Sequence, residues 1–286
     1  MGIQENADDF CIYGLRFETR LLLGTSRYES PRQLVEAISA ADPAMLTVSL
    51  RRNCLGAKGA QNTFWSLLQE THRTILPNTA GCHTAREAIN TACLARELFE
   101  TNFVKLEVIG DEVNLQPDPF GLVEAARELI KLGFQVFPYC TEDWVLCKRL
   151  LDLGCEVLMP WAAPIGTGQG PRNPSALREL RQRATDIPLI TDAGIGLPSH
   201  ACQVMEWGFD GVLLNTAVAR AVHPVRMAGA FAAAVRAGRS AFLGGPMTVQ
   251  QSAVASTPEI GRPFSADLSP LSSSKAGRGP DRVTGS

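Results

Sequence analysis

Eight short apolar runs recur along the chain, and each is followed by a stretch with apolar residues at helical spacing. The starts of these runs lie 22 to 32 residues apart. Strands that alternate with helices of this length predict repeated βα units and a parallel sheet. Eight units in about 220 residues predict a single α/β domain, a (β/α)₈ barrel of the TIM type. The runs are Leu21–Thr25, Met45–Leu50, Ile75–Gly81, Phe103–Gly110, Gln135–Thr141, Val157–Ala163, Leu189–Gly194 and Gly211–Ala217.

The segments between the runs have the pattern of amphipathic helices. In the second unit, Arg51–Gln61 is expected to be a long loop before a helix over Asn62–Thr74. The first run ends in Leu23-Gly24-Thr25-Ser26-Arg27, without the G-x-G-x-x-G of an open dinucleotide-binding sheet. The other predicted helices are Thr84–Glu100, Pro119–Leu132, Asp143–Leu153, Ser175–Ala184, Pro198–Glu206 and Pro224–Ala237.

Three parts of the chain are expected from this pattern. Residues 1–20 form an N-terminal extension, with a small hairpin that covers one mouth of the barrel. Residues 21–247 form the barrel itself. Residues 248–286 form a C-terminal segment rich in Ser, Pro and Gly, which we expect to be flexible from about residue 265 because it lacks large apolar residues.

Composition and charge narrow the classes of function. The chain has 286 residues, 45% of them hydrophobic, and a net charge of −2, which argues against a broad nucleic-acid-binding face. No apolar run approaches the roughly 20 residues of a membrane span. The N-terminus lacks the order of a signal peptide, so a cytoplasmic location is expected. The eight cysteines form no C-x-x-C pair and the four histidines show no ligand spacing, so we expect reduced thiols and no metal.

Lys105 is the first candidate for chemistry, because it lies in an otherwise apolar strand. Side chains alternate along a strand, so Lys105 and Glu107 share one face. A buried lysine beside a carboxylate is either a structural ion pair or a nucleophile that forms a Schiff base. Burial would lower the pKa of the lysine and Glu107 would raise it, and the sequence leaves this balance open.

The ends of the other strands supply the remaining candidates, because the active site of such a barrel lies at the C-terminal ends of its strands. Asp192 ends the seventh run and offers a second carboxylate, or else a helix cap. Glycines after the seventh run and a helix after Asn215-Thr216 predict a phosphate site, although each loop alone is typical of an ordinary turn. Arg51 and Arg52 either guide an extended, carboxylate-ended partner or belong to a solvated loop.

Six motifs, in order along about residues 10 to 260, resemble the thiazole synthase family of bacterial thiamine biosynthesis. The chain differs from the family's pattern in loops, with Ser26 and Arg27 in place of Gly and Lys, and His200 in place of Asp. These differences lie in loops and leave Lys105, Glu107 and Asp192 unchanged. They bear on how a partner protein would dock rather than on the reaction itself. The motifs are Pro77–Cys82, Phe103–Asp111, Pro138–Thr141, Ala163–Gly168, Asp192–Gly196 and Leu214–Ala217.

The resemblance implies a transferase that condenses 1-deoxy-D-xylulose 5-phosphate with dehydroglycine and sulfur. The sulfur would arrive as a thiocarboxylate on a small ubiquitin-like carrier protein, and another enzyme would make the dehydroglycine. Lys105 would form an imine with the sugar ketone, while Glu107 and Asp192 would move protons. No metal or organic cofactor is implied. The residues that fall where the family binds the phosphosugar are Gly166, Ala193, Gly194, Asn215 and Thr216.

Two other functions remain open at this point. One is a Schiff-base aldolase or isomerase on the same barrel, which would turn over a phosphosugar without a sulfur donor. The other is a non-catalytic barrel that binds a phosphosugar or the carrier protein. The many Ala and Leu residues also favour a homo-oligomer.

Overall fold

The computed structural model describes residues 8–50, 58–254 and 256, apart from the side chains of 58–63. Contacts divide the chain into two units, Met1–Pro246 and Met247–Ser286, and the first unit holds every helix and strand that the structure describes. Residues 257–286 lie outside the described residues, so the flexible tail from about residue 265 stays a prediction. The division at residues 20 and 247 likewise stays a prediction.

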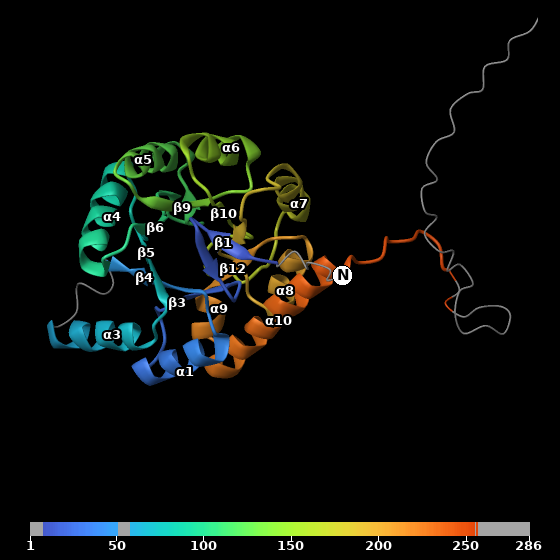
Figure 1. Ribbon diagram of the computed structural model, residues 1–286, viewed down its shortest axis with the longest axis horizontal. Helices are drawn as coiled ribbons and strands as arrows, with labels where there is room; N and C mark the ends of the chain where they lie inside the picture. The colour runs from blue at the N-terminus through green and yellow to red at the C-terminus, as the bar shows by residue number, and fades with distance from the viewer. Residues whose placement is uncertain (1–7, 51–57, 255, 257–286) are drawn as a thin grey trace, which may run out of the picture. The chain divides into compact units, whose positions relative to one another are not determined.

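The centre of the first unit is a sheet of eight parallel strands, in the order β10-β9-β6-β5-β4-β3-β12-β11 (Figure 1). Two isolated bridges, Leu158 to Leu189 and Trp161 to Asp192, join β10 to β11 and close the sheet. The predicted (β/α)₈ barrel is therefore confirmed. The strands are β3 (Leu21–Gly24), β4 (Met45–Ser49), β5 (Thr74–Asn78), β6 (Phe103–Leu106), β9 (Gln135–Cys140), β10 (Met159–Pro160), β11 (Ile190–Thr191) and β12 (Gly211–Leu214).

Helices form a ring around the sheet (Figure 1). Several begin at a residue whose side chain accepts a hydrogen bond from a free backbone N–H of the first turn, as Ser30, Thr84 and Asp143 do. These caps fix where those strand-to-helix loops end. The helices are α1 (Pro31–Ala41), α3 (Lys58–Glu70), α4 (Ala85–Phe99), α5 (Pro119–Lys131), α6 (Trp144–Leu153), α7 (Pro174–Arg183), α8 (Pro198–Glu206), α9 (Thr216–Ala219) and α10 (Pro224–Gly244).

Two apolar cores lie on the two faces of the sheet. Inward-facing residues such as Leu22, Met45 and Leu76 fill the barrel. Outward-facing residues such as Leu23 and Leu46 pack between the strands and the helices. This division follows the alternation of side chains along each strand.

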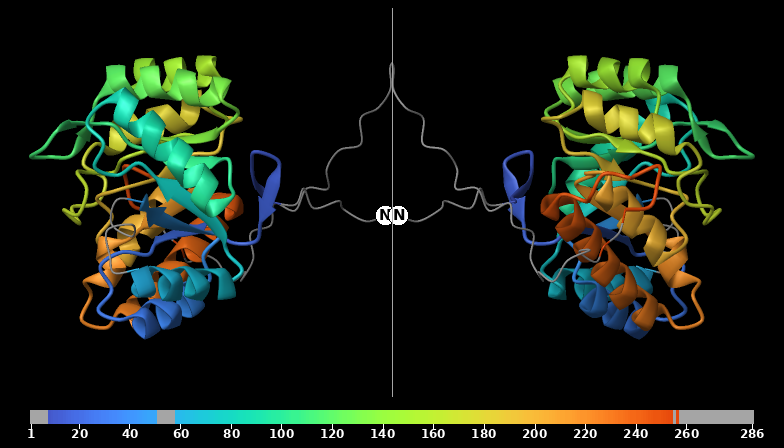
Figure 2. Two further views of the ribbon diagram at one scale, coloured as in Figure 1. Left: turned by 90° about the vertical axis from the view of Figure 1, so that its left-hand side faces the viewer. Right: turned by 90° about the vertical axis from the view of Figure 1, so that its right-hand side faces the viewer.

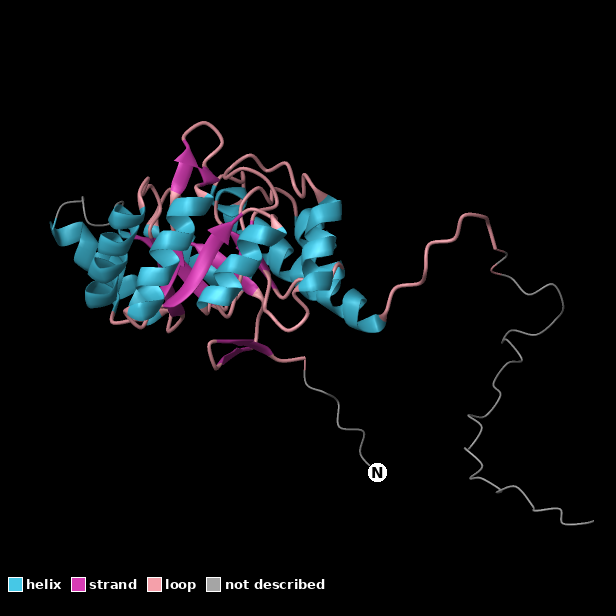
Figure 3. Cartoon of the chain, turned by 90° about the horizontal axis from the view of Figure 1, so that it is seen from above, coloured by secondary structure: helices cyan, strands magenta, loops and turns pink. Residues whose placement is uncertain are grey.

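Two small hairpins lie at opposite ends of the barrel (Figure 2 and Figure 3). One pairs β1 (Phe10–Ile12) with β2 (Leu15–Phe17), and Phe10 and Ile12 join the core inside the barrel. The Tyr13 hydroxyl in its turn donates a hydrogen bond to the Val136 carbonyl at 2.7 Å, at the start of β9. This hairpin therefore covers the N-terminal end of the barrel. The other pairs β7 (Ile109–Asp111) with β8 (Gln116–Pro117) at the C-terminal end.

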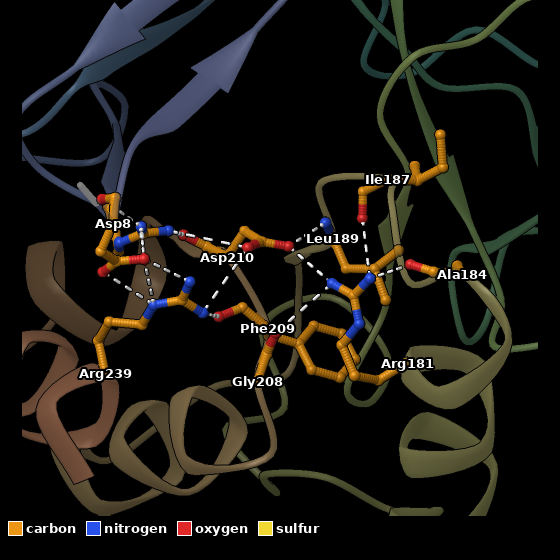
Figure 4. Close-up of polar contacts among 10 residues, drawn as sticks. Asp8, Arg181, Ala184, Ile187, Leu189, Gly208, Phe209, Asp210 and Arg239 are labelled. Atoms are coloured by element: carbon orange, nitrogen blue, oxygen red, sulfur yellow. Dashed lines mark hydrogen bonds and ion pairs between the residues drawn. The ribbon is translucent and has the colours of Figure 1, made fainter. Parts of the chain in front are cut away.

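A network of arginines and carboxylates fastens the covered end (Figure 4). Asp8, which precedes the hairpin, pairs with Arg239 of α10 at 2.6 Å and with Arg20 at 2.8 Å. Asp210 pairs with Arg181 of α7 at 2.7 Å and lies within 4 Å of Arg20 and Arg239. The three arginine side chains are 9–14% exposed, so these pairs are largely shielded from solvent.

Several predicted bounds were wrong. α3 begins at Lys58, inside the predicted loop, and it ends at Glu70, before the predicted end at Thr74, because His72 just after it has a φ of +53°. The strand predicted over Phe103–Gly110 ends at Leu106, because the Val108 carbonyl accepts from the N–H of Asp118 and the chain turns into the hairpin. α10 continues to Gly244.

Some expectations concern metals, thiols and membranes. Arg51, Arg52 and Cys54 lie outside the described residues, so the expected role of the two arginines stays a prediction. Along the residues described, no helix has the length and apolar character to cross a membrane. The same residues contain no group of three or more His, Cys, Asp or Glu side chains placed to hold a metal ion, and their cysteines are free thiols.

Candidate active site

Lys105 lies between two carboxylates at the C-terminal end of the barrel. It projects inward from β6, Glu107 follows the same strand, and Asp192 follows β11. The Lys105 Nζ is 3.2 Å from Glu107 Oε1 and 2.5 Å from Asp192 Oδ2. All three residues are at most 5% exposed. The structure thus brings together the three residues proposed from the sequence to carry the chemistry.

The balance of charges around Lys105 favours the ammonium form. Burial lowers the pKa of the amine, but attraction to Asp192 and then Glu107 outweighs burial and raises the pKa above its ordinary value of 10.5. The competition that the sequence left open is therefore decided by the second carboxylate. At neutral pH the resting Lys105 is protonated and is not a nucleophile.

Tyr139 forms one wall beside the lysine. Its ring centroid is 5.7 Å from Lys105 Nζ, and its hydroxyl donates to the Leu115 carbonyl at 3.4 Å. Burial raises the pKa of Tyr139, and the charges of Asp192 and Glu107 raise it further, so the ring stays neutral. In the sequence, Tyr139 was noted only as part of the motif Pro138–Thr141, with no role of its own. The alternation of side chains along the strand could have identified it. Lys105 pairs with Phe137, and because Phe137 points into the barrel, Tyr139 two residues later points inward as well.

The loops after β10 and β11 pack backbone against backbone. Gly194 has a φ of +73°, and a Cβ there would lie 2.4 Å from the Ala163 side chain. A Cβ on Gly196 would lie 2.4 Å from the Gly168 carbonyl oxygen. The N–H of Gly170 also donates to the Gly194 carbonyl at 2.8 Å. The two loops therefore form one rigid segment, which we call the glycine cradle (residues 163–170 and 193–196).

The residues expected to bind phosphate lie on this cradle and beside it. Gly166 has a φ of +78°, and a Cβ there would be 4.0 Å from the hydroxyl oxygen of Thr216, the first residue of α9. Ala193 has a φ of +59°, a left-handed conformation that costs an L-residue about 1–2 kcal/mol. Asn215 donates from Nδ2 to the Ser26 hydroxyl at 2.8 Å. Gly166 and Thr216 are thus neighbours, and Ala193 and Gly194 lie on the other loop of the cradle.

His200 stabilises the start of the helix that follows the cradle. Its Nδ1 accepts hydrogen bonds from the N–H groups of Gly196 and Leu197, each at 3.3 Å. Burial lowers the pKa of His200, which favours the neutral ring that this acceptor role requires. A histidine stands here where the family pattern has an aspartate, and it accepts hydrogen bonds at the start of α8.

Two hollows on the surface lie away from Lys105. One, of about 760 Å³, lies among residues of α5, α6 and the loops before them, and includes Phe120, Val123 and Val145. The other, of about 680 Å³, lies at the starts of α1 and α10. Neither is lined by the lysine or its carboxylates. The chemical argument therefore rests on the buried side chains at the barrel mouth.

Comparison with known proteins decides the family. The family model described as "Thiazole biosynthesis protein ThiG" matches residues 11–258. The chain belongs to this family. The thiazole synthase of Cupriavidus necator is 60% identical over 258 residues, which cover 90% of this chain and 93% of the relative. The thiazole synthase of Burkholderia thailandensis is 59% identical over 264 residues, 92% of this chain and 97% of the relative.

A solved structure of the family's fold agrees with this assignment. The complex of Amycolatopsis orientalis BexX with CysO includes a chain that matches with a TM-score of 0.75 and 30% identity, over 85% of this chain and 98% of that one. The chain is therefore an enzyme, a sulfur-transferring thiazole synthase of thiamine biosynthesis. The resemblance seen in the sequence is confirmed.

Proposed function

We propose that the chain condenses 1-deoxy-D-xylulose 5-phosphate, dehydroglycine and sulfur into the thiazole phosphate of thiamine, through an imine on Lys105. The observation that carries this proposal is the buried lysine held between Glu107 and Asp192. A structural ion pair needs only one carboxylate beside the lysine. Two carboxylates around one amine supply a nucleophile and two groups that can exchange protons with it.

The first step is activation of the lysine. Because Lys105 rests as an ammonium, it must lose a proton before it attacks the ketone. Asp192, whose oxygen is nearest at 2.5 Å, accepts that proton as the sugar arrives. The amine then adds to the ketone carbon, and the proton held by Asp192 passes to the carbonyl oxygen, which becomes a hydroxyl. Asp192 next takes a proton from the nitrogen of the adduct and returns it to that hydroxyl, which leaves as water and gives the protonated imine.

Glu107 serves the later steps. Its oxygen lies 3.2 Å from the amine, so a ketone carbon bound to Lys105 would lie within reach of the same carboxylate. Moving the double bond along the sugar requires removal of one C–H proton and return of another. Glu107 is placed to carry these protons while sulfur adds and the ring closes.

The glycine cradle is proposed to hold the phosphate. Its positive-φ residues give the backbone a conformation in which N–H groups can face an anion, and close backbone packing keeps the loops fixed. Gly166, Ala193, Gly194, Asn215 and Thr216 are the proposed phosphosugar contacts. With the phosphate anchored there, the ketone can reach Lys105 across the barrel mouth.

A small ubiquitin-like carrier protein is the proposed sulfur donor, through the thiocarboxylate of its C-terminal glycine. The structural relative BexX forms a complex with CysO, which supports a protein partner for this fold. No resident cofactor or metal is part of the proposal. The homo-oligomer and the cytoplasmic location stay predictions.

Borohydride trapping tests the imine. The enzyme is treated with borohydride in the presence of the phosphosugar, and its peptides are analysed by mass spectrometry. We expect the reduced sugar adduct on the peptide that contains Lys105 and none in Lys105→Ala, while Lys148→Ala, an exposed lysine on α6, traps normally. An adduct on another lysine, or none, would contradict the proposal.

Reconstitution separates the synthase from an aldolase or isomerase on the same barrel. The enzyme is supplied with the phosphosugar, the thiocarboxylated carrier and dehydroglycine, and each component is omitted in turn. We expect thiazole phosphate only from the complete mixture. Conversion of the phosphosugar alone into a new sugar phosphate would favour the aldolase or isomerase.

A further inference from the structure

Thr79 holds the backbone of Glu107 with a single hydroxyl group. This threonine follows β5 and is fully buried. Its Oγ1 accepts a hydrogen bond from the Glu107 N–H at 2.7 Å and donates one to the Glu107 carbonyl at 2.7 Å. The Thr79 N–H also donates to the Lys105 carbonyl at 3.1 Å. One residue outside the proposed chemistry therefore touches the main chain of both Lys105 and Glu107.

Glu107 needs this contact because the regular sheet has ended beside it. β6 stops at Leu106, and its neighbour in β9 at that level is Pro138, which has no N–H to donate. Beyond Glu107 the chain leaves the barrel, since the next carbonyl, of Val108, bonds to the N–H of Asp118. The Thr79 hydroxyl replaces the ladder hydrogen bonds that a longer strand would have made.

We infer that Thr79 is a positioning residue that fixes the Glu107 carboxylate beside Lys105. The inference rests on the proposed role of Glu107 in proton transfer. Asp192 reaches the lysine from the end of β11, on a different strand, whereas the hydrogen bonds of Thr79 go to the backbone of Lys105 and Glu107. Loss of the Thr79 hydroxyl therefore affects the steps that depend on Glu107 and spares formation of the imine at Lys105.

The test compares Thr79→Val with Thr79→Ser. Valine keeps the shape and leaves the two backbone groups of Glu107 without a partner, whereas serine keeps the hydroxyl. Thr91→Val is the matched control, because Thr91 is also buried and its hydroxyl contacts only Cys82 in the described structure. Borohydride trapping counts the sites able to form the imine, and thiazole phosphate formed per trapped site measures the later steps.

We expect Thr79→Val to trap normally and to form product about 100-fold more slowly per trapped site, the loss typical of a displacement of about 1 Å at a catalytic group. Thr79→Ser should recover most of the rate, and Thr91→Val should equal the native enzyme. An unchanged rate in Thr79→Val, or equal losses in the valine and serine variants, would overturn the inference.

Amide hydrogen exchange tests the contact without any substrate. We expect the Glu107 N–H of the native enzyme to be protected although it lies beyond the strand, to exchange faster in Thr79→Val and to be protected again in Thr79→Ser. Free exchange in the native enzyme would overturn the inference, and this measurement does not require the valine variant to fold. If Glu107→Gln retains full activity while the amide is protected, the proposed role of Glu107 has failed instead.

Discussion

At the scale of single residues, the site is built on a lysine whose pKa is raised. Many nucleophilic lysines are prepared by burial, which lowers the pKa and leaves a free amine. Lys105 is equally buried, but Asp192 and Glu107 outweigh that effect. If Lys105 is the nucleophile proposed above, nucleophile and base form one ionic group, and the amine must be released when the substrate binds. Such an arrangement would limit reaction with other carbonyl compounds.

The pH dependence of imine formation follows from this charge state. If solvent had to deprotonate Lys105, the rate would rise about tenfold per pH unit below its pKa, because the amine fraction rises in that proportion. With Asp192 as the internal acceptor, we expect a flat profile between about pH 7 and pH 9, where the ion pair persists. The rate of borohydride trapping measures it. A slope of one across this range would show that the proton leaves to solvent.

Replacing Asp192 and Glu107 one at a time by the matching amide tests their separate roles in proton transfer. We expect Asp192→Asn to slow trapping by about 10²- to 10⁴-fold, the usual contribution of a general base, and to make the remaining rate rise with pH. Glu107→Gln should trap at a rate close to that of the native enzyme and fail to form the thiazole. Slow trapping in Glu107→Gln, with normal trapping in Asp192→Asn, would instead assign the general-base role to Glu107.

Part of this site could be predicted from the sequence. The shared face of Lys105 and Glu107 follows from alternation along a strand, and the arrival of Asp192 follows from the rule that catalytic groups gather at strand ends. The protonation of the lysine could not be predicted, because it depends on a distance of 2.5 Å. The contact from Thr79 depends on where β6 leaves the sheet, which the apolar pattern does not record.

At the scale of elements, the glycine cradle shows why small residues are required in two loops. Strands β10 and β11 are each two residues long, so few ladder hydrogen bonds hold them together. The loops after them compensate by packing main chain on main chain. The sequence predicted these glycines as a phosphate site, and their mutual contact could be recognised only once the loops were placed side by side.

Substituting a cradle glycine tests this packing. Gly196→Ala would place a Cβ 2.4 Å from the Gly168 carbonyl oxygen, so the loops must separate. We expect the KM for the phosphosugar to rise at least about tenfold, equivalent to 1.4 kcal/mol. Gly229→Ala in α10 is the control, since its Cβ would meet only the Ala40 carbonyl at 3.8 Å and helix propensity predicts about 0.5–1 kcal/mol of added stability. Equal KM values would contradict the packing argument.

His200 makes the cradle sensitive to acid. Its pKa is lowered in the folded protein from 6.5, so its contribution to stability is complete above pH 6.5 and is lost as the pH falls through the lowered pKa. Protonation turns the Nδ1 acceptor into a donor that faces two N–H groups. We expect the phosphosugar KM to rise below about pH 6 in the native enzyme and less so in His200→Asp, whose carboxylate still accepts. Identical pH profiles would contradict this role.

Helix and strand prediction succeeded where periodicity and caps agreed. The eight strands were each found in the predicted order, because buried parallel strands leave short apolar runs between turns. The predicted ends of strands and helices were wrong where contacts with distant parts of the chain determine them. β6 ends early because a hydrogen bond from Asp118 draws the chain into a hairpin, and no local propensity marks that point.

At the scale of the whole barrel, charge and apolar contacts fasten the end opposite to Lys105. The pKa of Asp8 is lowered, first by its hydrogen bond to Arg239, so its contribution to stability is present above pH 3.8 and is lost as the pH falls through the lowered value. The hairpin and α10 are thereby connected to the strands across the bottom of the barrel. Length and repeat pattern predicted the barrel and the cover, but not this network.

Removing the charge of Asp210 tests the network. Asp210→Asn leaves three largely buried arginines with one fewer counter-charge, and the cost of breaking a buried ion pair is about 3 kcal/mol or more of unfolding free energy. Denaturant unfolding of the native and variant proteins measures it. The control is Glu36→Gln, whose partner Arg32 is 88% exposed, and we expect less than about 1 kcal/mol there. Similar losses in both variants would show that the network is no stronger than a surface pair.

The covered end has a kinetic consequence. Because the β1–β2 hairpin and the packed interior block one end of the barrel, all reactants and products must use the other. If the sugar is attached to the buried Lys105 as proposed, it lies below the open mouth, so later reactants must arrive over it and cannot precede it. Steady-state kinetics should therefore show compulsory ordered addition with the phosphosugar first. The finished thiazole should compete with that sugar for the empty enzyme.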